Sequence, residues 1–281
     1  MISTEFEFFA PTELSEALNL LSEHGEGAKL LAGGMSMVPA MNLGILRPTA
    51  VVSLNHVPAL DYVREEADHL RIGAMVRHER VVSDPLIRQH VPLLSEAASR
   101  IADVQIRHRG TIGGSVAHAD PAADYLPVMV ATGATVKVAS SRGERTSSAR
   151  DFFVDVMMTS LEPGEALVEI QVPKLLQGSS SAYDRLARVE GSFAIVNAAA
   201  IVNGGKPVIA IGGATPTPVV VEPAVDLSRG VSESALDEIS NAAFAACEDA
   251  FGDLWGSADY RRAMARVYAK RVVQKALAAT G

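Results

Sequence analysis

Apolar residues near the start of the chain recur at intervals of three and four. Across residues 14–21 these positions fall on one face, which is the spacing of an amphipathic helix. Thr12, directly after Pro11, is the expected N-cap, and Gly25 is the expected end. The pattern therefore predicts a first helix between Thr12 and Gly25.

Most other apolar residues occur in short runs rich in valine, isoleucine and leucine, bounded by glycine, proline or serine. Such runs predict strands. The predicted strands are 28–32, 49–55, 69–76, 134–140, 165–173, 193–202 and 207–215. Residues 91–102 have helical spacing, and from about Ser232 the pattern is helical again. The last segment has one apolar stripe, made of Met264, Val267, Tyr268, Val272 and Ala276.

Strands and helices are therefore partly segregated, without a regular alternation of strand, helix and strand. This predicts an α+β chain. One boundary is expected near residue 56. A second is expected near residue 178, where the segment 175–184 is rich in glycine and serine. The chain divides into 1–56, 57–177 and 178–281.

The composition is that of a soluble globular protein. Of 281 residues, 48% are hydrophobic and 21% are charged, and the formal net charge is −8. No long run of lysine or arginine is present, so we expect no nucleic-acid partner. No apolar run is long enough to cross a bilayer, and residues 1–18 lack the pattern of a secretory signal. We therefore expect a cytoplasmic protein without a membrane span.

Cysteine and histidine restrict the chemistry further. Cys247 is the only cysteine, which excludes an internal disulfide and a cysteine-ligated iron–sulfur cluster within this chain. The seven histidines are scattered, without His-Glu-x-x-His spacing or clustered carboxylates. We therefore expect no protein-bound catalytic metal.

Two segments share one pattern, in which apolar residues are followed by paired glycines and then by a serine one or two residues later. They are the first glycine segment, residues 30–37 (LLAGGMSM), and the second glycine segment, residues 110–117 (GTIGGSVA). Paired glycines let a backbone turn with positive φ and approach a ligand closely, because no Cβ intervenes. Successive N–H groups then form an anion-binding concavity, to which a nearby hydroxyl adds a donor. Together the segments predict a site for the diphosphate of a dinucleotide.

The same pattern has a structural interpretation, since Gly-Gly pairs also occur in ordinary turns. Residues 203–206 (NGGK) and 211–215 (IGGAT) are predicted as turns of that kind. Neither glycine segment contains a G-x-G-x-x-G fingerprint or a G-x-x-x-x-G-K-[ST] phosphate loop. The common nucleotide-binding folds are therefore disfavoured.

Four stretches in order along the chain, 31–48, 101–134, 159–173 and 183–200, resemble one family. They are similar to the FAD-binding medium subunit of molybdenum hydroxylases. This is the flavoprotein of carbon monoxide dehydrogenase and of nicotine- and quinoline-type dehydrogenases, and the flavin domain of xanthine dehydrogenase. The similarity extends over essentially the whole chain. It implies two α/β subdomains, 1–56 and 57–177, that clasp FAD, and a C-terminal domain, 178–281, of a three-stranded sheet with helices.

The resemblance also implies which residues bind the cofactor. Around the pyrophosphate it implies Leu31, Ala32, Gly33, Gly34, Met35, Ser36 and Met37 of the first glycine segment, and Thr111, Gly113, Gly114 and Ser115 of the second. Asp124, with Asp120 as a second candidate, would hydrogen-bond the ribityl or ribose hydroxyls. Around the flavin it implies Ile101, Ala102, Leu161, Arg185 and Phe193.

Three residues differ from those that relatives often carry at the same positions. Met35 stands where many relatives have a polar side chain such as histidine or glutamine, although its backbone N–H is retained. Phe193 stands where the flavoprotein of carbon monoxide dehydrogenase has a tyrosine beside the isoalloxazine, so ring contact is kept and a hydroxyl is lost. Arg185 occupies a position where relatives often have lysine.

Each implied residue also has an ordinary structural interpretation. Ile101, Ala102, Leu161 and Phe193 are common in cores and strands. Asp124 fits a helix cap, and Arg185 fits a solvated charge.

The resemblance implies an electron-transfer subunit. It would receive electrons from a small 2Fe–2S partner subunit and pass them to an external acceptor, while a large subunit with the molybdenum cofactor acts on the substrate. The implied assembly is a dimer of heterotrimers. One alternative is a stand-alone FAD-dependent oxidase, with His118 and Asp120 as candidate bases. Another is a scaffold subunit without flavin.

Overall fold

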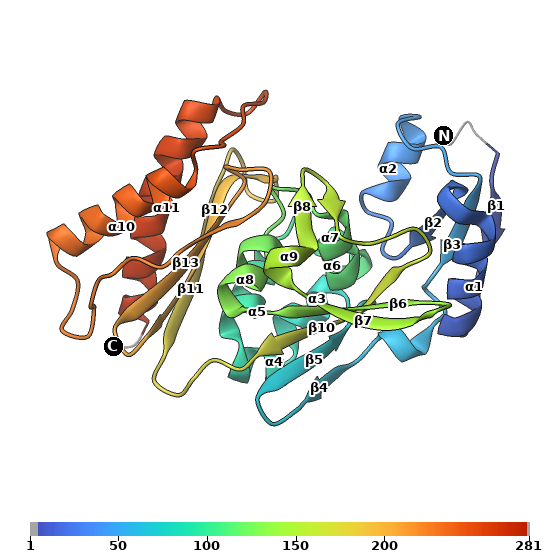
Figure 1. Ribbon diagram of the computed structural model, residues 1–281, viewed down its shortest axis with the longest axis horizontal. Coiled ribbons are helices and arrows are strands. Elements are labelled where there is room, and N and C mark those ends of the chain that lie inside the picture. The colour runs from blue at the N-terminus through green and yellow to red at the C-terminus, as the bar shows by residue number, and fades with distance from the viewer. Residues whose placement is uncertain (1–4, 280–281) are drawn as a thin grey trace.

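A computed structural model describes residues 5–279, laid out in three parts along the longest axis (Figure 1). The N-terminal part is a parallel sheet of order β1–β3–β2 with two helices. Its elements are β1 (Glu7–Phe9), α1 (Leu14–His24), the 3-10 turn η1 (Gly25–Gly27), β2 (Ala28–Leu31), α2 (Met37–Asn42) and β3 (Ala50–Ser53). The first glycine segment is the connection from β2 into α2.

Helix α1 buries its predicted apolar face and ends at Gly25, as expected. The predicted cap is wrong. The first helical hydrogen bond runs from the N–H of Ala17 to the carbonyl of Glu13, so Glu13 is the N-cap and Thr12 lies outside the helix.

The middle part is an antiparallel sheet of order β4–β5–β10–β6–β7, with short helices over it. Its strands are β4 (Val63–Glu65), β5 (His69–Gly73), β6 (Thr135–Ser140), β7 (Gly143–Ser148) and β10 (Ala166–Pro173), besides the hairpin of β8 (Phe153–Asp155) and β9 (Met158–Thr159). Its helices are η2 (Pro58–Leu60), α3 (His78–Ser83), α4 (Pro85–His90), α5 (Pro92–Ser99), α6 (Val104–Arg109), α7 (Ile112–His118), α8 (Tyr125–Thr132) and α9 (Ala149–Phe152).

The C-terminal part is an antiparallel sheet of order β11–β12–β13–β14, with two helices packed on one face (Figure 1). Its elements are β11 (Ser180–Ala187), β12 (Ala194–Asn203), β13 (Lys206–Gly212), β14 (Val219–Val221), α10 (Glu233–Ala246) and α11 (Ala258–Ala278). The family resemblance implied three strands here, and the short edge strand β14 adds a fourth. The turn predicted at 203–206 joins β12 to β13.

Helix α8 connects the middle and C-terminal parts. All its residues from Tyr125 to Ala131 are buried, because α5 and α7 pack on one side and β12 and β13 on the other. An apolar helix without a polar face fits such a buried position. The middle and C-terminal parts are thereby packed together around α8.

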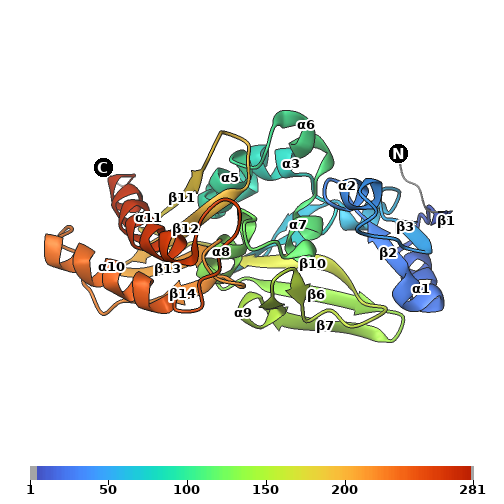
Figure 2. The same ribbon diagram turned by 90° about the horizontal axis from the view of Figure 1, so that it is seen from above.

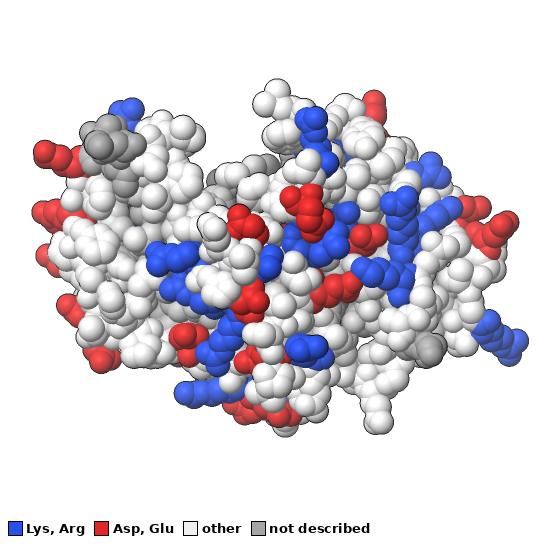
Figure 3. Space-filling model, turned by 180° about the vertical axis from the view of Figure 1, so that it is seen from behind, with Lys and Arg blue, Asp and Glu red and all other residues white. Residues whose placement is uncertain are grey.

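No helix among residues 5–279 combines the length and apolarity that crossing a bilayer demands. Within the same residues, no group of three or more His, Cys, Asp or Glu side chains is arranged to hold a metal ion. On the face seen in Figure 3, acidic and basic side chains are interspersed over the central region.

Candidate cofactor site

The two glycine segments, about eighty residues apart in sequence, meet in space. A Cβ at Gly33 would lie 2.4 Å from the carbonyl oxygen of Arg109 and 2.6 Å from the Cα of Gly110. A Cβ at Gly114 would lie 3.4 Å from the Cβ of Ala32. Seen from above, the connection into α2 lies beside α7 (Figure 2). The absence of side chains therefore lets the two backbones approach each other.

The second glycine segment is a helix, and the expectation that it turns with positive φ is wrong. Thr111 caps α7 by accepting a hydrogen bond from the N–H of Gly114 on its hydroxyl. Gly113 is required for packing, since its Cβ would lie 2.5 Å from the Cβ of Ala74. The N–H groups of residues 112–115 all have partners within the chain. This segment therefore contributes space and two hydroxyls, of Thr111 and Ser115, rather than free amide hydrogens.

The first glycine segment contributes the free donors. Gly34 has the predicted positive φ, +77°. Among the described residues, no hydrogen-bond acceptor meets the N–H groups of Gly33, Gly34, Met35 and Ser36. Consecutive unpaired N–H groups in such a turn are suited to an anion. Only the tertiary structure distinguishes this segment from its counterpart.

Two arginines add positive charge next to this junction. The carbonyl of Arg109 contacts Gly33, and the side chain of Arg77 donates to that same carbonyl. Partial burial, and then the positive charge of Arg109, lower the pKa of Arg77. Two guanidinium groups that repel each other in this way favour a negatively charged guest. Sequence analysis missed Arg77, because nothing local to it signals a contact with residue 109.

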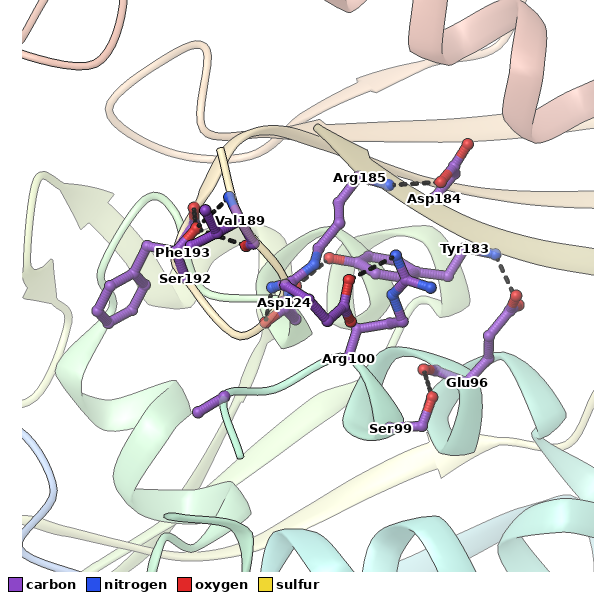
Figure 4. Close-up of polar contacts among 12 residues, drawn as sticks. Glu96, Ser99, Arg100, Asp124, Tyr183, Asp184, Arg185, Val189, Ser192 and Phe193 are labelled. Carbon is purple, nitrogen blue, oxygen red and sulfur yellow. Dashed lines mark hydrogen bonds and ion pairs between the residues drawn. The ribbon is translucent and has the colours of Figure 1, made fainter. Parts of the chain in front are cut away.

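Further along, the loop between β11 and β12 carries Phe193, and it lies on the residues that follow α5. A Cβ at Gly191 would lie 3.4 Å from the carbonyl carbon of Ala102, and the side chains of Arg100 and Glu190 approach to 3.7 Å. Phe193 is 64% exposed, which an interior strand residue would not be. Figure 4 shows its ring directed away from the side chains of Asp124 and Arg185.

Backbone strain also marks this region. Ala102 has φ +40°, a left-handed conformation that alanine rarely adopts. Such strain is found preferentially where a ligand site requires it.

Ile101 and Leu161 are partly buried against the central core. No described contact joins Leu161 or Asp120 to Phe193, and the carboxylate of Asp120 accepts a local hydrogen bond from the N–H of Ala122.

Asp124 is the N-cap residue of α8, but its side chain makes no capping hydrogen bond and instead forms a buried pair with Arg185, which is therefore not a solvated charge. The Nη1 of Arg185 lies 3.1 and 3.3 Å from the two carboxylate oxygens of Asp124, and Tyr183 donates its hydroxyl to the same carboxylate (Figure 4). Burial raises the pKa of Asp124, and the charge of Arg185 opposes that rise. The Nε and Nη2 atoms of Arg185 are buried without a hydrogen-bond partner. Buried donors usually have an acceptor, so these two atoms can bind an ordered water or a polar group of a ligand.

These observations fit FAD. The first glycine segment and the two arginines suit a diphosphate. Phe193 offers an accessible aromatic face, and Arg185 retains two unpaired donors next to Asp124. The roles of the individual residues remain predictions.

Comparison with known proteins covers nearly the whole chain. Residues 4–175 match the family described as FAD binding domain in molybdopterin dehydrogenase, and residues 181–276 match the CO dehydrogenase flavoprotein C-terminal domain. The chain is 39% identical to the carbon monoxide dehydrogenase medium chain of Hydrogenophaga pseudoflava, with 99% of each chain covered. It is 34% identical to the nicotine 6-hydroxylase medium subunit of Paenarthrobacter nicotinovorans, with 97% of this chain and 98% of the relative covered.

Solved structures are similar in fold as well. A chain of carbon monoxide dehydrogenase from Hydrogenophaga pseudoflava superposes with a TM-score of 0.94 at 39% identity, covering 99% of both chains. A chain of quinoline 2-oxidoreductase from Pseudomonas putida 86 gives a TM-score of 0.89 at 34% identity, covering 98% of both.

Proposed function

Because the chain belongs to the family of FAD-binding medium subunits of molybdenum hydroxylases, as its motifs predicted, we propose that it transfers electrons within such a complex. It is an oxidoreductase subunit whose cofactor is FAD. In the proposed role, it receives electrons from a small 2Fe–2S subunit and passes them to an external acceptor. The substrate reacts on a large subunit that holds the molybdenum cofactor, and the complex is a dimer of heterotrimers.

The observation that carries this proposal is the junction of the two glycine segments. The N–H groups of residues 33–36 are unpaired there, where the backbone of Gly33 closely approaches that of Arg109 and Gly110. FAD, when bound, supplies the electron-carrying chemistry. The chain itself binds the diphosphate, orients the ring system and leaves Phe193 accessible from outside.

A substitution in α7 tests the site. The Cβ position of Gly114 faces Ala32 across the junction, so Gly114→Asp places a carboxylate where the diphosphate is expected. Purified wild-type protein should show a flavin absorbance spectrum that bleaches on reduction, and Gly114→Asp should retain no FAD. Gly178→Asp is the control: position 178 is an exposed turn with no atom near its Cβ, and its φ of +82° means that this variant also tests whether backbone strain alone releases FAD. Stoichiometric FAD in Gly114→Asp would refute the site.

The partners are tested by purification of the native complex. Mass spectrometry of the co-purifying chains should identify one large and one small subunit, and the isolated chain should oxidise no small alcohol or amine. Turnover by the isolated chain would instead favour a stand-alone oxidase. A colourless chain that still joins the complex would favour a scaffold.

A further inference from the structure

The side chain of Asn55, just after β3, contacts the first glycine segment. Its Nδ2 donates to the carbonyl of Ala32 at 3.0 Å and to the hydroxyl of Ser53 at 3.0 Å. Its Oδ1 accepts from the Nη2 of Arg77 at 2.8 Å. Both the nitrogen and the oxygen of the Asn55 amide therefore have partners, which fix its orientation.

Arg77 continues this connection to the second glycine segment. Its Nη1 donates to the carbonyl of Arg109, the residue directly before that segment. The backbone of Arg77 also pairs with Thr111 in an isolated antiparallel bridge. Asn55 and Arg77 thus form one polar link between Ala32 and Arg109, which we name the Asn55–Arg77 strap.

The strap fixes the direction of the peptide groups that it contacts. In a planar trans peptide, the carbonyl of one residue and the N–H of the next point to opposite sides. Because Asn55 holds the carbonyl of Ala32, the N–H of Gly33 is directed away from the strap. The carbonyls of Ala32 and Arg109 are likewise held by the hydrogen bonds that they accept from the strap.

We propose that Asn55 and Arg77 are positioning residues for FAD, which hold the two glycine segments at the separation and orientation that the diphosphate requires. The inference rests on the proposed function. The strap acts before the cofactor arrives: it removes the cost of ordering two distant backbone segments at the moment of binding. Arg77 acts through its two directed hydrogen bonds, so a cation of different shape cannot replace it.

The strap lies beside a pocket, and this location distinguishes a positioning role for FAD from a role in the stability of the fold. Asn55 and Arg77 line a pocket of about 400 Å³, together with His56, Asp61 and Met75. Water can therefore reach both side chains when either is shortened, and the free protein should lose little stability. FAD affinity, in contrast, should fall strongly, because it depends on the geometry of both segments.

The experiment measures FAD affinity and stability separately on the full-length chain. The variants are Asn55→Ala, Arg77→Lys, Arg77→Gln and the double variant Asn55→Ala/Arg77→Gln. FAD dissociation constants are measured by fluorescence titration of FAD-depleted protein, and the Tm is measured without FAD. Each single variant should bind FAD about 10- to 100-fold more weakly, the effect of one or two directed hydrogen bonds to charged groups. The Tm without FAD should change by only a few degrees.

Two further readouts are specific to positioning. The double variant should be no weaker than the weaker single variant, since both substitutions break one link. The phosphorus resonances of bound FAD should also shift in Arg77→Lys relative to wild type. Arg80→Gln is the matched control: Arg80 pairs with Asp61 beside the same pocket but contacts neither glycine segment, so its FAD affinity should stay within about twofold of wild type.

Each contrary outcome has a distinct meaning. If Arg77→Lys binds FAD with wild-type affinity, only the charge at position 77 matters, and the proposed positioning role of the strap is wrong. If FAD affinity and the Tm without FAD fall in proportion across the variants, the strap acts only on stability, and the positioning role is likewise wrong. A wild-type chain that takes up no FAD would instead refute the proposed function itself.

Discussion

The guanidinium of Arg185 on β11 contacts both carboxylate oxygens of Asp124, at 3.1 and 3.3 Å, and so joins the C-terminal sheet to the start of α8. Both side chains are almost fully buried. A buried carboxylate is tolerated because this cation and the hydroxyl of Tyr183 compensate for the loss of water.

Removal of that cation should destabilise the protein severely. Arg185→Met leaves the charge of Asp124 buried beside one hydroxyl, and we expect the free energy of unfolding to fall by about 3–5 kcal/mol. Urea denaturation at pH 7 measures this. Arg150→Met is the control, because the pair of Arg150 with Glu222 is exposed and should contribute at most about 1 kcal/mol. Equal losses in the two variants would contradict the prediction.

Gly33→Ala should separate the glycine segments. The added methyl group would lie 2.4 Å from the carbonyl oxygen of Arg109, which is backbone and cannot rotate away. We expect purified Gly33→Ala to lose most of its FAD, measured as the ratio of flavin to protein absorbance. Gly178→Ala strains an exposed turn, where φ is +82°, but its Cβ meets no other atom, so this control should keep the wild-type ratio. Normal FAD content in Gly33→Ala would mean that close approach is not required.

His78 should make the protein sensitive to acid. Burial, and then the charges of Arg77 and Arg107, lower the pKa of His78 from 6.5 to about 4. The folded state therefore binds fewer protons than the unfolded state between pH 6.5 and 4. Stability from this group is fully present above pH 6.5 and is lost as the pH falls toward 4, by about 3 kcal/mol in total.

Denaturation at several pH values tests this assignment. The Nδ1 of His78 lies 3.0 Å from the hydroxyl of Tyr125, so His78→Asn can keep a hydrogen bond there without titrating. The variant should show a flatter dependence of unfolding free energy on pH between 6.5 and 4. A wild-type slope in His78→Asn would assign the acid sensitivity to other groups.

Cys247 should be unreactive in the folded protein. It is fully buried at the end of α10, and burial raises the pKa of its thiol to about 12. Thiolate is the reactive form, and it is scarce at pH 8. Ellman's reagent should modify one thiol per chain in denaturant and essentially none in the native state within minutes. Rapid native modification would show that this part of α10 opens.

Local sequence patterns predicted the central strands β2, β3, β5, β6, β10, β12 and β13 and the helices α1, α5, α10 and α11, but they missed strand β11 and the short helices α2, α3, α4 and α6 to α9, and they predicted the hydrogen bonds of the site poorly. The apolar run predicted as a strand at 193–202 forms β12, Ala194–Asn203, and the apolar stripe of the last segment packs α11 on the sheet. The second glycine segment is predicted to turn with positive φ, but from Ile112 onward it is helix α7. Its glycines are explained by close contact with Ala74 and with the first segment, and both contacts are distant in sequence.

The sequence by itself determined where side chains are absent, which faces are apolar, and, through its motifs, the family. Only the tertiary structure decided which N–H groups stay free, that Asp124 pairs with Arg185, and that Asn55 and Arg77 link the two segments. The physical reason is distance along the chain. Propensity and periodicity act within a few residues, whereas these hydrogen bonds join residues 22 to 61 positions apart. Such partners are chosen only when the packed sheets and helices bring them together.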